Sequence, residues 1–84
     1  MADDADRQQV LAELERFKAM GEKDYDDMYE ARSPSEAGVC YSGAKENFHD
    51  AIGLASRLGL AEEAEALTRR LEHIKAVFRS QFAQ

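Results

Sequence analysis

Several features that would place this chain in a membrane or outside the cell are missing from its sequence. The single cysteine, Cys40, has no partner for an intrachain disulfide. No apolar stretch follows Met1, so we expect no signal peptide. No run approaches the roughly 18 apolar residues that a membrane span requires. The sequence therefore predicts a cytoplasmic protein with no membrane partner.

Basic residues are also too few to balance the acidic ones. The chain has 11 Lys and Arg against 17 Asp and Glu, a net charge of −6. Residues 1–36 hold 11 acids and 5 bases, whereas residues 37–84 hold 6 of each. Because nucleic acids are bound largely through Lys and Arg contacts to phosphate, we expect no nucleic-acid partner. A solvated acidic surface that keeps the protein dissolved explains this distribution.

Helix breakers are nearly absent. Pro34 is the only proline in 84 residues, there is no tryptophan, and a third of the residues are charged. Long stretches without proline can remain helical. A chain of this length forms one core. The sequence predicts a single all-α domain over residues 1–84.

Apolar residues recur at intervals of three and four in three stretches, which is the spacing of one face of a helix. We expect helices over residues 7–31, 34–58 and 61–82. The acidic residues 1–6 lack apolar anchors, so we expect them to fray. The stripes contain, among others, Leu14, Phe17, Tyr25 and Met28 in the first helix, Ala44, Phe48 and Ala51 in the second, and Leu67, Leu71 and Ile74 in the third.

The boundaries of the second helix have clear signals. Ser33 and Glu36 have the spacing of a capping box, with Pro34 at the first helical position. Gly59 suits the left-handed conformation that ends many helices. Because both connections are short, we expect an antiparallel, up-down arrangement of three helices. Gly21 interrupts the first helix with a poor helix former, and a break there would give four helices; the apolar stripe crosses Gly21 in phase, which favours one continuous helix.

One spacing resembles a metal ligand pair. Glu46 and His49 are three residues apart, which places both on one helix face, as in carboxylate-bridged metal sites of helical bundles. Such sites need a second pair, and the residue three positions before His73 is Arg70. We therefore expect no metal and no cofactor, and a metal-binding bundle that uses Glu46 and His49 is the alternative function. There is no glycine-rich phosphate loop and no nucleophile–base pair, so we expect no catalysis.

Binding to another protein is the function that remains. A narrow three-helix bundle leaves part of each apolar stripe near solvent, and a second subunit would cover it. A homodimer is the commonest arrangement, and a groove that receives a helical segment of another protein is the other possibility. Tyr25, Met28, Tyr29 and Val39 lie near the turn between the first two helices and are the predicted partner-binding residues.

Overall fold

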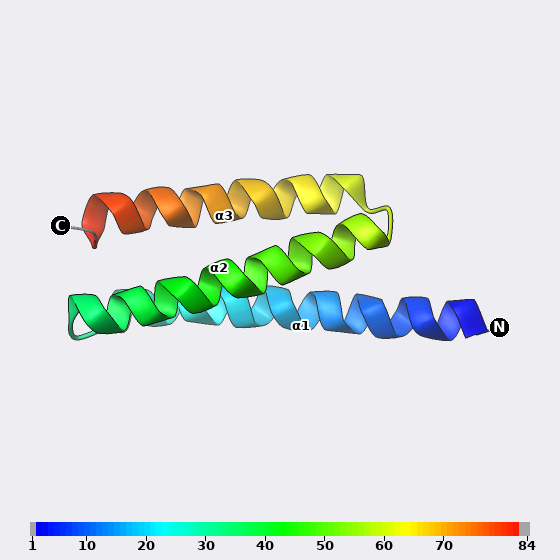
Figure 1. Cartoon of the computed structure of the whole chain (residues 1–84), viewed down its shortest axis with the longest axis horizontal. Helices are drawn as coiled ribbons and strands as arrows, with labels where there is room; N and C mark the ends of the chain where they lie inside the picture. Colours follow the sequence, from blue (N-terminus) through cyan, green and yellow to red (C-terminus); the bar gives the residue numbers. More distant parts are fainter. Residues whose placement is uncertain (1, 83–84) are drawn as a thin grey trace.

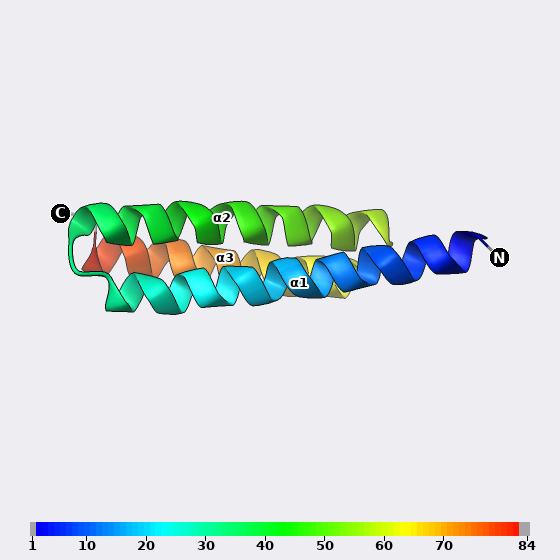
Figure 2. The same ribbon diagram turned by 90° about the horizontal axis from the view of Figure 1, so that it is seen from below.

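Three helices joined by two short turns form residues 2–82, the part of the chain that the computed structural model describes (Figure 1). Helix α1 spans Ala2–Glu30, α2 spans Pro34–Arg57 and α3 spans Ala61–Gln81. Consecutive helices run in opposite directions, so α1 and α3 are parallel to each other (Figures 1 and 2). The predicted all-α, up-down arrangement of three helices is confirmed.

The closest packing in the bundle is between α1 and α2. Gly21 is buried, and a Cβ atom there would lie 2.7 Å from Cε2 of Phe48. At Gly43, a Cβ atom would lie 2.8 Å from Oδ2 of Asp24. Both glycines therefore allow side chains of the opposite helix to approach the backbone. Gly21 does not break the helix, because α1 continues through it to Glu30, and the four-helix alternative is wrong.

The first helix starts earlier than expected. It begins at Ala2, so residues 2–6, which we expected to fray, continue the helix, while Met1 lies outside the described residues. No helix breaker separates them from the apolar stripe, and acidic side chains near a helix N-terminus are favoured by the helix dipole. The first turns of α1 extend beyond the turn between α2 and α3 (Figures 1 and 2). Side chains 4–9 are exposed as a result.

At both turns, hydrogen bonds satisfy backbone groups that the ends of the helices leave unpaired. Ser33 Oγ accepts a hydrogen bond from the Glu36 backbone N–H (3.1 Å), and the Glu36 carboxylate accepts one from the Arg32 N–H (2.8 Å). The carboxylate thus reaches one residue further back than in a standard capping box. At the other turn, Gly59 has a φ of 73°. Bonds from Gly59 N to Ser56 O and from Leu60 N to Ala55 O complete a Schellman motif.

The three apolar stripes meet along the axis of the bundle. Their largest members are exposed by 2% or less, so this part of the core is closed without help from a second subunit. The fully buried large side chains are Leu14, Met28, Phe48, Leu71 and Ile74. Alanines of α2 fill the space between them, which allows the helix axes to approach; these are Ala37, Ala44, Ala51 and Ala55.

Exchanging glycines for alanine tests this packing. Gly38 and Gly53 lie inside α2, and apart from their chain neighbours and the backbone of the same helix, no atom lies within 4 Å of the position a Cβ would take. Gly38→Ala and Gly53→Ala should each raise the free energy of unfolding by roughly 0.5–1 kcal/mol, because alanine loses less entropy in a helix. Gly21→Ala should lower it by about 1–3 kcal/mol through overpacking against Phe48. Urea unfolding measures all three, and stabilisation by Gly21→Ala would refute the close approach.

Candidate functional site

The predicted partner-binding residues divide into two buried and two exposed side chains. Tyr25 and Met28 are only 8% and 0% exposed, whereas Tyr29 is 49% and Val39 73% exposed. Tyr25 and Met28 therefore lie in the core and present almost no accessible surface to a partner. Both belong to the same helical stripe as Leu14, and this stripe faces the core.

Tyr29 and Val39 contact different neighbours and do not form one patch. The Tyr29 ring packs edge-on against Phe82 at the end of α3, with ring centroids 5.6 Å apart. Val39 lies over a shallow hollow together with Cys40 and other residues of its own helix. Burial, followed by nearby carboxylates of α1, raises the pKa of the Cys40 thiol. The surface around Val39 is therefore on the α1 side of α2, away from Phe82.

Five of the seven aromatic residues form a continuous row across the three helices. Tyr25 contacts Tyr29, Tyr29 contacts Phe82, Phe82 contacts Phe78, and Phe78 stacks on Tyr41 at 3.9 Å between centroids. This aromatic row is located where α1 ends, α2 begins and α3 ends (Figure 1). Tyr41, Phe78 and Phe82 are only partly buried. The row therefore places incompletely covered rings at one end of the bundle.

Ion pairs connect α1 to α3. The Arg70 guanidinium donates two hydrogen bonds to the Glu22 carboxylate, at 2.7 and 2.8 Å, and Lys18 donates one to Glu63 at 2.6 Å. Since these pairs are partly exposed, each contributes modestly to stability. Their position nevertheless covers the core along this side. A partner helix would find ion pairs here rather than an open apolar groove.

Tyr25 lies beneath this cover. Its hydroxyl is 3.2 Å from that of Tyr29 and 3.5 Å from Nε2 of His73, and the Arg70 guanidinium lies 4.9 Å above its ring. Burial, together with the hydrogen bond to Tyr29, raises the pKa of Tyr25 to about 12. The polar groups of this cluster interact with one another, and the cluster connects α1 to α3.

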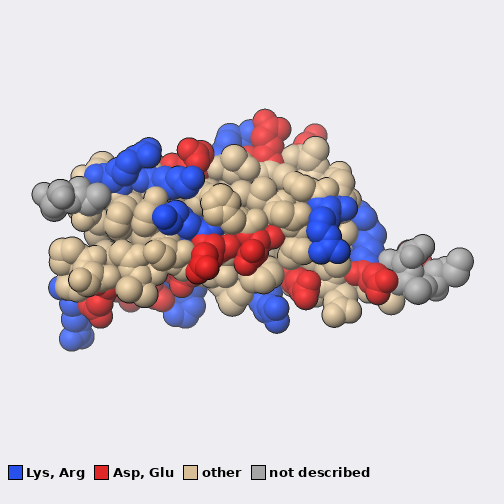
Figure 3. Space-filling view, viewed as in Figure 1, with Lys and Arg blue, Asp and Glu red and all other residues tan. Residues whose placement is uncertain are grey.

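A group of cations adjoins the stacked pair Tyr41 and Phe78. Lys45 Nζ lies 4.5 Å from the centre of the Tyr41 ring. Arg79 follows Phe78 in the sequence, and Lys75 lies one turn before it. Lys and Arg side chains gather over the C-terminal half of α3 (Figure 3, upper left). We call Lys45, Lys75 and Arg79 the basic patch; sequence reasoning missed it, because two helices contribute to it and the overall charge is negative.

One strip of the solvent side of α2 carries no charged residue, although Glu46, Asp50 and Arg57 are exposed on the same side of the helix. Five small residues at helical spacing lie away from its core stripe and form what we call the small-residue row, with the exposed His49 among them: Ser35, Gly38, Ser42, Gly53 and Ser56. A Cβ at either glycine would meet open space, so neither is required by packing within the chain. The periodicity of these residues is visible in the sequence, but only the structure shows that all of them except the half-buried Gly38 are exposed.

The suspected metal ligands show no convergence on a site. Glu46 and His49 are both exposed on α2. Within residues 2–82, no group of three or more His, Cys, Asp or Glu side chains is arranged to hold a metal ion. The Glu-x-x-His spacing is present, but the other helices bring it no further ligands.

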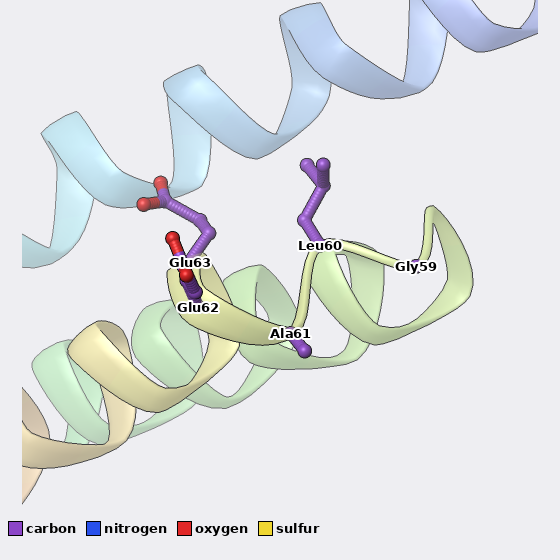
Figure 4. A pocket seen from close by; sticks show the side chains of 5 residues that line it. All are labelled: Gly59, Leu60, Ala61, Glu62 and Glu63. Atoms are coloured by element: carbon purple, nitrogen blue, oxygen red, sulfur yellow. The ribbon is translucent and has the colours of Figure 1, made fainter.

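A second hollow lies at the turn between α2 and α3 (Figure 4). Leu60 and Glu63 point from this turn toward α1, and the Glu63 carboxylate is bound by Lys18. The hollow is shallow, and its lining holds no nucleophile beside a base.

Comparisons with known proteins identified no relative of this chain. No family model, no curated protein and no solved structure matches this chain. Among the helices described, none is both long and apolar enough to cross a membrane. Function must therefore be argued from surface chemistry alone.

The buried phenol gives a pH prediction. Because the folded protein keeps the Tyr25 proton to higher pH than the unfolded chain, the free energy of unfolding should fall as pH rises from 10 toward 12. An ultraviolet absorbance titration should show one phenol that deprotonates near pH 12, and Tyr25→Phe should remove that step. The absence of any phenol that deprotonates near pH 12 would contradict the burial of Tyr25.

Proposed function

We propose that the protein is a non-catalytic interaction module that associates with itself through the side formed by α2 and α3. The distribution of charge carries this proposal. Helix α1 has ten acidic and four basic residues, a net charge of −6, whereas α2 has a net charge of −1 and α3 is neutral. Copies of an acidic protein repel one another. Contact through α2 and α3 keeps the two acidic helices apart.

The small-residue row supports this choice of surface. Glycine inside a helix costs roughly 0.5–1 kcal/mol relative to alanine, and no packing within the chain offsets this cost at Gly38 and Gly53. Small side chains allow a second helix to approach closely. If a helix of a second copy packs on this row, both glycines allow its close approach.

The partly exposed rings support it as well. Tyr41 and Phe78 lie between α2 and α3 and stack on each other, and each retains accessible surface. Aromatic residues are enriched in the buried centres of protein interfaces. An interface over this side would remove these rings from water.

Mass measurement across a concentration series tests the proposal. The chain has a mass of 9.4 kDa. Light scattering with size exclusion, from about 10 μM to about 1 mM, should show the mean mass rise toward that of a dimer, because bringing two exposed faces together buries apolar surface. A mass of 9.4 kDa at every concentration would end the proposal.

A matched pair of variants locates the surface. Gly53→Gln adds a polar side chain to the small-residue row, and should weaken association about tenfold or more while helicity is unchanged, because the added atoms hold the helices apart. Ala19→Gln makes a similar addition to the exposed side of α1 and should have no effect. Equal effects from the two substitutions would show that the contact does not involve α2.

A further inference from the structure

The N-terminal turns of α1 form an acidic projection. Residues 4–9 are exposed and extend past the turn between α2 and α3, and we call them the projecting segment (Figures 1 and 2). Arg7 is directed back at its own chain, where its guanidinium donates to the carbonyl oxygen of Leu58 at 3.4 Å. Asp4 and Asp6 take part in none of the ion pairs found among residues 2–82. The segment therefore presents the carboxylates of Asp4 and Asp6, unpaired among the described residues, beside an exposed Arg7 that bonds to its own chain.

The basic patch has the complementary chemistry. Lys45 and Arg79 take part in no ion pair within the described part of the chain, while Lys75 is paired with Glu72 at 3.3 Å. The ring of Tyr41, which stacks on Phe78, lies against Lys45, and Lys75 and Arg79 are neighbours of Phe78 along α3. Cations next to aromatic surface suit an acidic helix that also carries small apolar side chains such as Ala5.

These two surfaces cannot meet within one molecule. The molecule is 51 Å long. The projecting segment is at one end, and Arg79 is close to the other, beside the turn between α1 and α2 (Figure 1). Figure 3 shows Lys and Arg over the C-terminal half of α3, whereas acidic and basic atoms lie together near the N-terminal end of α1. Only a second molecule can bring the two surfaces together.

We infer that the projecting segment of one copy docks on the basic patch of a second copy, and that two antiparallel copies make this contact twice. This inference rests on the proposed self-association and specifies its geometry. When two such molecules lie side by side in opposite directions, the projecting end of each is beside the patch-bearing end of the other. The contact is then reciprocal, as in a two-fold dimer.

A charge exchange between two variants tests this contact. Lys45→Glu with Arg79→Glu makes the patch acidic, and Asp4→Lys with Asp6→Lys makes the projecting segment basic. Each double variant should be monomeric alone, because like charges would meet at both contacts. Mixed in equal amounts, they should form a heterodimer at wild-type affinity, since both contacts then join opposite charges. Sedimentation at about 50 mM salt measures all three samples.

Two controls separate this inference from the proposed function. Arg16→Glu with Lys23→Glu makes the same change in net charge at exposed sites of α1, away from the α2 and α3 side, and should leave association intact. Raising the salt from about 50 to about 500 mM should weaken wild-type association on the order of tenfold, because exposed charges are screened. Association that survives salt and both double variants, yet is lost in Gly53→Gln, would overturn this contact and leave the proposed function standing. A wild-type monomer under all conditions would overturn both, and failure of the mixture to associate would overturn the charge pairing.

Discussion

The contact between the α1 backbone and the Phe48 ring sets the geometry of the rest of the bundle. A Cβ at Gly21 would lie 2.7 Å from the ring, so this residue type determines how closely α1 and α2 approach. Alanines on the core side of α2 maintain the same short spacing along the helix. With α1 and α2 so close, α3 meets α2 through apolar side chains and reaches α1 mainly through longer polar ones. The ion pairs across this last contact follow from that asymmetry.

Much of the fold could be predicted from local signals. The apolar stripes, the cap at Ser33 and the left-handed Gly59 each depend on residues close together in sequence, and the structure has three helices with those boundaries. The role of Gly21 could not be derived in this way. A glycine that ends a helix and one that admits a neighbouring ring look alike until the neighbour is known, although the unbroken stripe gave the correct preference. The start of α1 was placed too late, because the absence of apolar anchors does not by itself prevent a helix.

The candidate site was less accessible to sequence reasoning. Tyr25 and Met28 belong to the apolar stripe of the first helix, and the structure buries both, so a position near a turn does not make these side chains accessible. Tyr29, one residue from Met28, is half exposed, since a single step around a helix is enough to leave the core. The basic patch depends on which residues of α2 and α3 become neighbours. Which residues become neighbours is determined by tertiary packing and cannot be read from one segment. The negative net charge of the chain also gives no indication of a local group of cations.

The aromatic row also governs what can be observed by spectroscopy. With no tryptophan in the chain, ultraviolet emission comes from three tyrosines, and all three belong to this row. Tyrosine emission therefore reports on the end of the bundle where α1 ends and α3 ends, while circular dichroism averages over every helical turn. If that end opens before the remainder, the two signals will change at different denaturant concentrations. The placement of the rings thus makes local opening at one end distinguishable from unfolding of the whole.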